Sequence, residues 1–126
     1  MSGPRGPRDR RAALRLGLHA EVVAALFLRL KGYRILDRRF MAGGGEIDIV
    51  ALRGSTIVFV EVKLRADLDA AAEAIGGVKR RRIARAVANW RTRHPWSSSH
   101  AMRGDALLMA PWRWPRHVED AFPLEP

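Results

Sequence analysis

The chain has 126 residues, enough for a single domain that buries most of its apolar surface without disulfide or metal cross-links. It contains no cysteine, which excludes disulfides, thiolate zinc sites and cysteine nucleophiles, and we expect a cytoplasmic protein. Lysine and arginine outnumber aspartate and glutamate by 23 to 13, and the net charge of +10 favours a polyanionic partner such as nucleic acid. An arginine-rich proteome would produce the same excess, so charge alone does not decide the partner.

The N-terminal segment is rich in arginine, glycine and proline, which predicts a disordered basic tail over residues 1–10. It has no apolar run, so we do not expect a secretory signal. No stretch reaches the uncharged length of a membrane span, since Arg15, Glu21 and Arg29 interrupt the longest candidate. Residues 11–126 are expected to form one domain that does not associate with membranes.

Apolar spacing and turn signals predict the elements of this domain. A helical pattern runs from residue 11 to 31 and ends at Gly32, a residue type that commonly terminates helices. Strands are predicted next, over residues 33–40, 46–52 and 56–64. The remaining elements are a short helix or ordered loop (67–75), a helix (78–93), a serine-rich loop (96–100), a strand (106–110) and a strand or turn (116–122). This α-β-β-β-α-β order predicts an α/β fold, with a mixed sheet of about four strands flanked by helices.

Charged residues occur inside the second and third predicted strands, where the neighbouring residues are apolar. Asp48 belongs to the second strand, and Glu61 and Lys63 share one face of the third. Burying a charge is costly unless it is paired or bound to a metal. Two carboxylates beside a lysine are the groups that metal-dependent phosphodiester hydrolysis requires. The structural alternative is a hairpin with a Glu–Lys pair at its edge.

The pairing of these two strands depends on the turn between them. A two- or four-residue turn centred on residues 53–54 would place Asp48 opposite Phe59. Glu46 would then lie opposite Glu61, and Asp48 would be a diagonal neighbour of Glu61, about 7–8 Å away. A three-residue turn would instead move Asp48 to the other face.

We expect the site to bind Mg²⁺ or Mn²⁺, cations that prefer oxygen ligands and retain several waters. Asp48, Glu61 and the backbone carbonyl of Val62 are the expected ligands. Lys63 would orient or deprotonate the attacking water, or hold the scissile phosphate, and both roles remain open. Glu21 is a single acid in the apolar stripe of the first helix. It is either a third metal ligand or a helix-edge acid paired with an arginine.

Basic residues cluster in the helix predicted over residues 78–93. An amphipathic helix with this composition is expected to contact a phosphate backbone without sequence specificity, the alternative being a solvated helix face. The residues expected to bind nucleic acid are Lys79, Arg80, Arg81, Arg82 and Arg85.

Tryptophans and histidines give weaker signals. Trp90 is expected in the core, whereas Trp112-Arg113-Trp114 is the candidate for stacking on exposed bases. The four histidines have no mutual metal-ligand spacing and are expected to be surface or packing residues.

Several segments together resemble the bacterial YraN-like family. They are Leu16-Gly17-x3-Glu21-x3-Ala25, Lys31-Gly32-Tyr33-Arg34-Ile35-Leu36, Gly44-Gly45-Glu46-Ile47-Asp48-Ile49-Val50, Val58-Phe59-Val60-Glu61-Val62-Lys63-x-Arg65 and His117-Val118-x2-Ala121-Phe122. The resemblance spans residues 14–122 and implies the PD-(D/E)xK nuclease superfamily, with a restriction-endonuclease-like fold. It also implies that the family's acidic and lysine positions are occupied by Glu21, Asp48, Glu61 and Lys63.

The chain departs from the family pattern at three places. They are Arg38-Arg39-Phe40, the loop over residues 66–71, and Arg103-Gly104-Asp105. These departures leave the core site intact and concern substrate contacts made by loops.

These observations together predict a divalent-metal-dependent nuclease that hydrolyses phosphodiester bonds in DNA, in preference to RNA, including branched or structured DNA. A homodimer would suit the cutting of both strands of a junction. Two alternatives remain: a non-catalytic nucleic-acid-binding module with the same fold, and a scaffold whose basic surface binds an acidic protein. Metal dependence separates the nuclease from both, and the salt dependence of nucleic-acid binding separates the two alternatives.

Overall fold

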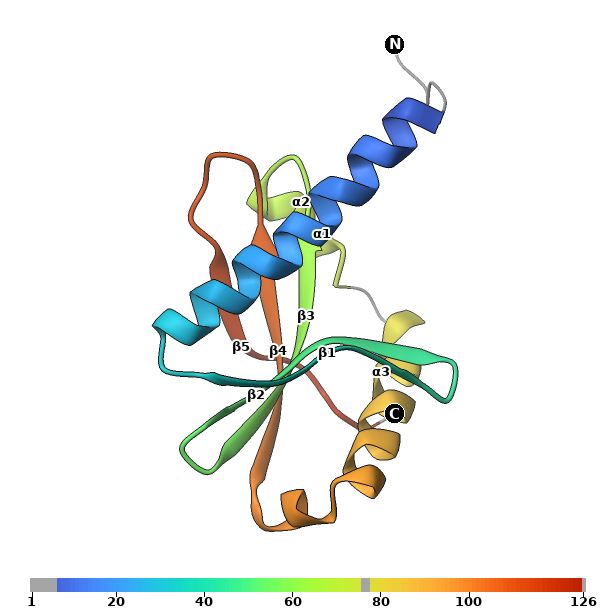
Figure 1. Cartoon of the computed structure of the whole chain (residues 1–126), viewed down its shortest axis with the longest axis vertical. Helices are drawn as coiled ribbons and strands as arrows, with labels where there is room; N and C mark the ends of the chain where they lie inside the picture. The colour runs from blue at the N-terminus through green and yellow to red at the C-terminus, as the bar shows by residue number, and fades with distance from the viewer. Residues whose placement is uncertain (1–6, 76–77, 126) are drawn as a thin grey trace.

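The computed structural model describes residues 7–75 and 78–125, with side chains described over residues 19–75 and 82–125 (Figure 1). The elements in chain order are α1 (Pro7–Leu30), β1 (Arg34–Ala42), β2 (Gly45–Arg53), β3 (Thr56–Leu64), α2 (Leu68–Glu73), α3 (Val78–Arg93), the 3₁₀ helix η1 (Pro95–Ser99), β4 (Ala101–Met109) and β5 (Arg116–Phe122). Of the tail predicted over residues 1–10, the first six lie outside the described residues, and α1 begins at Pro7. Within the described residues, no helix has both the length and the apolar character needed to cross a membrane.

The strands form one mixed sheet in the order β1-β2-β3-β4-β5. Among the described strands, β3 and β4 are the one parallel pair. The connection through α2, α3 and η1 returns the chain to the end of the sheet where β3 begins, so β4 runs in the same direction as β3. The remaining neighbours are antiparallel. The predicted α/β class with a mixed sheet flanked by helices is confirmed, and β5 adds a fifth strand where the sequence allowed a strand or a turn. The sheet is open and compatible with a restriction-endonuclease-like fold.

Helices cover both faces of this sheet, and α1 runs diagonally across one of them (Figure 1). On that face Leu28 of α1 belongs to the same buried cluster as Val58 and Val60 of β3. On the other face Trp90 of α3 is fully buried, as predicted, and meets the ring of Phe59 edge to face at 5.6 Å. Alternation along β3 therefore directs Glu61 and Lys63, like Phe59, to the face covered by α2 and α3.

A tight turn joins β2 to β3. Arg53 pairs with Thr56, so the turn consists of Gly54 and Ser55. Gly54 has φ 61° and occupies the first central position of the turn, where a glycine tolerates positive φ without strain. The turn is thus centred one residue later than the sequence analysis predicted.

This shift corrects the predicted register. Val50, not Asp48, lies opposite Phe59. The registered pairing ends at Ile49 and Val60, so neither Asp48 nor Glu46 has a paired partner on β3. The prediction was wrong by two residues, but a two-residue shift preserves alternation. Asp48 is still close to Glu61, because both side chains line the same pocket and the Glu61 charge acts on the Asp48 carboxyl.

The turn between β1 and β2 packs tightly against α3. A Cβ atom added at Gly45 would lie 1.8 Å from the carbonyl oxygen of Arg82, so only glycine fits at this contact. Gly43 and Gly44 both have positive φ, at 60° and 79°. The start of β2 is thereby fixed against the helix that carries Arg82.

Candidate active site

Asp48 lies where β2 separates from β3. The registered pairing of the two strands ends at Ile49 and Val60, and Asp48 Oδ2 instead accepts a 2.7 Å hydrogen bond from the Val62 amide. The N–H and C=O groups of a strand residue point to the same side. The Val62 carbonyl therefore faces the same open edge as the Asp48 carboxylate.

Glu61 and Lys63 form a buried ion pair beside Asp48. Lys63 Nζ lies 3.0 Å from Glu61 Oε1, and the lysine and glutamate side chains are only 7% and 10% exposed. Both residues are on the same face of β3, two positions apart, which brings the ammonium and the carboxylate together. The structure thus brings together Asp48, Glu61 and Lys63, the residues that the sequence predicted at the site.

Burial and the neighbouring charges raise the pKa of Asp48 strongly. Burial raises the pKa of the Asp48 carboxyl from 3.8 to about 7, and the neighbouring Glu61 carboxylate adds to the increase. The hydrogen bond from the Val62 amide opposes this increase, because it stabilises the ionised form. Near neutral pH, binding of a proton or a metal cation would therefore stabilise the Asp48 carboxyl by neutralising its charge.

Glu21 reaches the site from α1. Its Oε1 lies 3.3 Å from Arg39 Nε, close enough for an ion pair but without hydrogen-bond alignment, so Oε1 is a buried acceptor without a hydrogen-bond donor. Burial raises the pKa of Glu21, and the Arg39 guanidinium partly offsets this effect. The Glu21 charge also contributes to the raised pKa of Asp48. The ion pair with Arg39 matches the alternative of a helix-edge acid paired with an arginine, and the role of third metal ligand stays a prediction.

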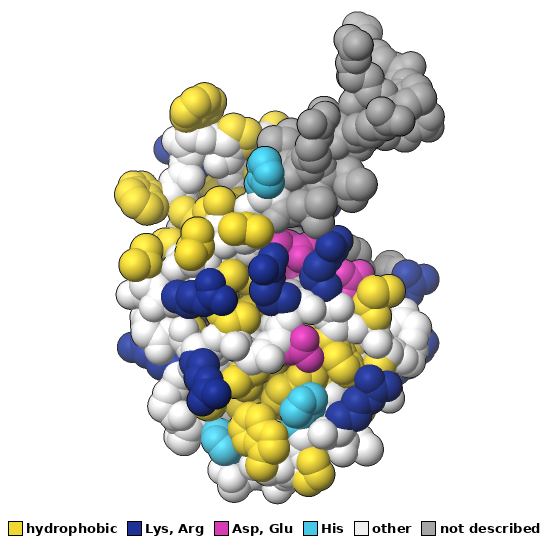
Figure 2. All heavy atoms as spheres, in the orientation of Figure 1, with side chains coloured by type: hydrophobic (Ala, Val, Ile, Leu, Met, Phe, Trp, Pro, Cys, Tyr) yellow, Lys and Arg dark blue, Asp and Glu magenta, His cyan; other side chains and the backbone are white. Residues whose placement is uncertain are grey.

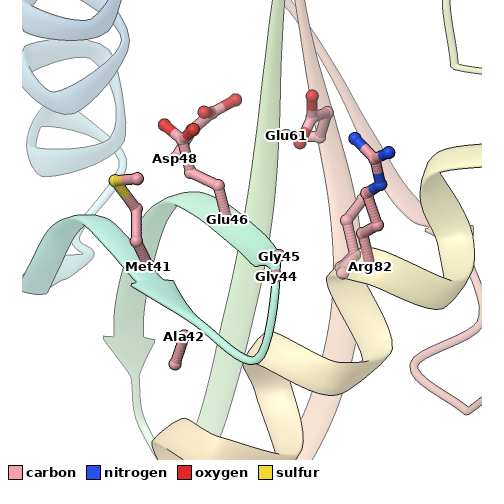
Figure 3. Close-up of a pocket in the computed structure, with 9 residues that line it drawn as sticks. Met41, Ala42, Gly44, Gly45, Glu46, Asp48, Glu61 and Arg82 are labelled. Atoms are coloured by element: carbon pink, nitrogen blue, oxygen red, sulfur yellow. The ribbon is translucent and has the colours of Figure 1, made fainter.

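An open pocket of about 560 Å³ adjoins these acids. Glu46, Asp48 and Glu61 line one side, and Arg82 and Ile83 of α3 line the other. Figure 3 shows the three carboxylates and the Arg82 guanidinium at the same end of the pocket. A phosphate group entering here would meet the arginine and the acids at once, which is the arrangement that a bridging cation would require.

The basic residues predicted to bind nucleic acid are described only in part. Arg82 lines the pocket, and Arg85 is exposed beside the turn that precedes β2. The side chains of Lys79, Arg80 and Arg81 lie outside the described residues. Figure 2 shows Lys and Arg side chains in a band next to a group of Asp and Glu side chains on one face of the molecule.

The site offers a hard cation only a few oxygen ligands. Within the described residues, no group of three or more His, Asp or Glu side chains is arranged to hold a metal ion. The donors predicted from the sequence that lie here are the carboxylates of Asp48 and Glu61 and the carbonyl of Val62. Such a set fits Mg²⁺, which binds few protein oxygens and keeps several waters.

A second polar cluster, centred on Asp105 in β4, was missed by the sequence analysis. Asp105 is fully buried and accepts hydrogen bonds from Arg103 at 2.8 and 2.9 Å and from His117 Nε2 at 2.7 Å. Burial would raise the pKa of Asp105, but the bonds from His117, Arg103 and the Asp120 amide outweigh it and hold the pKa at about 2. His117 was expected at the surface or in packing, and its partner lies 12 residues away on the neighbouring strand.

This cluster extends to the end of α1. Lys31 Nζ donates to His117 Nδ1 at 2.5 Å, which leaves Nε2 of the ring to donate to Asp105. Arg103 also donates to the Tyr33 hydroxyl at 3.0 Å. The only local signal for the cluster was an aspartate two residues after an arginine, just before an apolar strand. Its role is to join β4, β5 and the α1–β1 connection.

Comparison with known proteins gives a consistent family. Residues 20–109 match the family model described as "Uncharacterised protein family UPF0102". Relatives named UPF0102 protein occur in Methylobacterium nodulans (58% identity, covering 94% of this chain and 92% of the relative), Methylorubrum extorquens (54%, covering 99% and 98%) and Methylocella silvestris (54%, covering 93% and 94%). The chain therefore belongs to the UPF0102 family, the YraN-like family that its sequence motifs resemble.

Proposed function

We propose that this protein is a divalent-metal-dependent nuclease that hydrolyses phosphodiester bonds in DNA. The observation that carries the proposal is the placement of Asp48 beside the buried Glu61–Lys63 ion pair at the edge of an open pocket. Two neighbouring acids in a partly buried position destabilise the fold unless something neutralises them. A cation that also bridges to a phosphate would supply that neutralisation and give the arrangement a use.

Asp48, Glu61 and the Val62 carbonyl would hold the cation, Mg²⁺ or Mn²⁺. When bound, the cation would polarise the phosphoryl oxygen and make a nearby water more acidic. The hydrogen bond from the Val62 amide fixes the orientation of Asp48 before any substrate arrives. Glu21 would assist through its charge, which already acts on Asp48.

Lys63 and Arg82 would act on the substrate. The Lys63 ammonium, held by Glu61, would orient or deprotonate the attacking water or stabilise charge on the scissile phosphate. Arg82, across the pocket, would bind a phosphate oxygen. In the reaction the water oxygen bonds to phosphorus, the phosphorus–oxygen ester bond breaks, and the leaving oxygen takes a proton.

The substrate class follows from charge and chemistry. A net charge of +10 favours a polyanion, and we propose DNA, in preference to RNA, including branched or structured forms, acted on in the cytoplasm. Cutting both strands of a branched substrate would call for two active sites, so a homodimer is part of this proposal.

The test is cleavage of labelled single-stranded, duplex, flap and four-way-junction DNA with Mg²⁺ or Mn²⁺. We expect Asp48→Asn, Glu61→Gln and Lys63→Ala each to lose at least about 100-fold in rate, and a chelator to abolish cleavage. Glu125→Gln, which changes an exposed carboxylate to an amide far along the chain, is the matched control and should cleave normally. Cleavage that survives in Asp48→Asn would contradict the assigned site.

A second candidate is a nucleic-acid-binding module that does not cleave. The close Lys63–Glu61 ion pair favours it, because an ammonium already neutralises one of the two proposed metal ligands. In that case DNA would bind with strong salt dependence and no cleavage, and Asp48→Asn would bind as well as the wild type.

A further inference from the structure

Two tryptophans in the loop between β4 and β5 are left in solvent. Trp112 is fully exposed and Trp114 is 83% exposed, whereas Trp90 is buried and Trp96 packs edge to face against Trp90 at 5.9 Å. Large aromatic rings without packing partners are rare on soluble domains and commonly mark contact surfaces. Figure 2 shows hydrophobic side chains protruding at the upper left, where Figure 1 places this loop.

The loop backbone is constrained in the form that exposes these rings. Arg113 N donates to the Ala110 carbonyl at 3.3 Å, closing a turn, and Trp112 has φ 63°, a conformation unfavourable for a bulky residue. Pro111 and Pro115 bracket the Trp-Arg-Trp segment and restrict the chain further. A ligand that stacks on these rings would therefore cost little conformational entropy in ordering the loop.

The loop lies at the end of the sheet that carries the candidate active site. Leu64, one residue after Lys63, pairs with Met109 at the end of β4, and Arg65 N donates to the Met109 carbonyl at 3.0 Å. The exposed cations Arg65, Arg113 and Arg116 surround this corner of the molecule. One arginine lies between the two tryptophans in sequence, and others flank them. Single-stranded nucleic acids bind such surfaces by stacking their bases on the rings and placing their phosphates against the cations.

We propose that Trp112 and Trp114 stack on unpaired bases, with Arg113 contacting the adjoining phosphate. Duplex bases already stack on both faces, so only an unpaired segment can use these rings. The inference deepens the proposed function: the substrate is DNA with unpaired nucleotides next to the cleavage point. Nucleic acid is favoured over a lipid surface because a strand held at this loop can continue to Asp48 and Glu61. A bilayer on the same loop would instead cover that end of the sheet.

Binding without metal tests the proposal separately from cleavage. Fluorescein-labelled oligothymidylate and a blunt duplex with the same number of phosphates are titrated in EDTA and followed by anisotropy. We expect the double variant Trp112→Ala/Trp114→Ala to bind oligothymidylate about tenfold or more weakly, with unchanged duplex affinity. Trp112→Phe/Trp114→Phe should restore most of the affinity, and Leu30→Ala, which truncates another highly exposed apolar side chain, should bind as the wild type does.

Salt titrations separate stacking from charge. The alanine pair should weaken oligothymidylate binding at every salt concentration without changing the salt slope, whereas Arg113→Ala should reduce the slope by about 0.7. Equal losses on duplex and single strand, or no loss on either, would overturn the proposal. Loss of binding to vesicles containing anionic lipid, with oligothymidylate affinity retained, would also overturn it in favour of a membrane contact. Circular dichroism melts establish that each variant is folded.

The two proposals fail in different ways. Tryptophan-dependent binding of oligothymidylate without Mg²⁺-dependent cleavage supports the stacking loop and rejects the nuclease. Cleavage of flap DNA at the same rate by the wild type and the alanine pair supports the nuclease and rejects the loop's role.

Discussion

The Asp48 carboxylate accepts the Val62 amide at 2.7 Å, in the place where a β2 carbonyl would continue the strand pairing. This bond attaches an acid of β2 to the residue between Glu61 and Lys63. Asp48 therefore cannot retreat from Glu61 without exposing an unpaired amide. The backbone pairing at the end of β2 and β3 therefore holds the two acids close enough to repel each other.

The raised pKa of Asp48 predicts how stability varies with pH. Because the folded-state pKa is about 7 against an ordinary value of 3.8, the folded protein binds more protons than the unfolded chain between these values. The free energy of unfolding should thus fall as pH rises from about 4 to about 7. Asp48→Asn keeps an acceptor for Val62 and removes the charge, so at pH 8 it should be more stable than the wild type by roughly 1–4 kcal/mol.

Urea denaturation at pH 5, 6, 7 and 8 measures this effect. The advantage of Asp48→Asn should shrink toward pH 5, and the residual slope of the variant reflects the other raised acid, Glu21. Parallel pH profiles for the wild type and the variant would show that Asp48 ionises normally.

Added Mg²⁺ should stabilise the folded protein through the same acids. A ligand that binds only the native state raises stability by about 2.7 kcal/mol when it is present at 100 times its Kd. We expect the thermal midpoint of the wild type to rise with Mg²⁺ at pH 8 and to return when EDTA is added. Asp48→Asn and Glu61→Gln should show no such rise. A rise of equal size in these variants would place the cation elsewhere.

The Glu61–Lys63 ion pair should be strongly coupled. Removing one partner leaves a buried charge, so Lys63→Met and Glu61→Gln should each destabilise the protein by about 2–4 kcal/mol. The double variant should lose less than the sum of the two, because it removes both charges. Chemical denaturation of all four proteins gives the coupling energy. Additive losses would indicate that the two side chains act on stability independently.

The buried Asp105 cluster should dominate stability. Asp105→Asn breaks a charge-assisted network with Arg103 and His117, and we expect a loss of about 3–5 kcal/mol at pH 7. Since the folded-state pKa is about 2, the contribution of Asp105 is present above its ordinary value of 3.8 and is lost as pH falls toward 2. Asp69→Asn, an exposed acid in α2, is the control and should change stability little. A similar small change for Asp105→Asn would mean that the network is energetically neutral.

The sequence predicted some elements of the fold accurately and others only in part. The predicted bounds of β3 and α3 agree with the structure, because each is a periodic segment between clear turn signals. β4 was predicted only from residue 106, since Arg103 and Asp105 interrupt the apolar pattern of its first half and are held there by Tyr33 and His117. Tyr33 lies 70 residues from Arg103 in the chain, and local sequence patterns cannot predict such a pairing.

The candidate site was predictable for a different reason. Asp48, Glu61 and Lys63 contradict their apolar surroundings, and that contradiction is visible in the sequence itself. The register was wrong by two residues because the position of Gly54 within the turn was misjudged, yet the acids still meet. The ion pair between Glu21 and Arg39 depends on how α1 crosses the sheet, which no local pattern specifies.

The contact between Gly45 and the Arg82 backbone connects the two sides of the pocket directly. Gly45 stands three residues before Asp48 on β2, and the carbonyl of Arg82 occupies the space that a Cβ atom would need. If Arg82 binds a phosphate as proposed, any movement of its backbone would act on the same turn of α3 against which β2 packs. Occupancy of one wall of the pocket would be transmitted directly to the strand that holds the acid on the other.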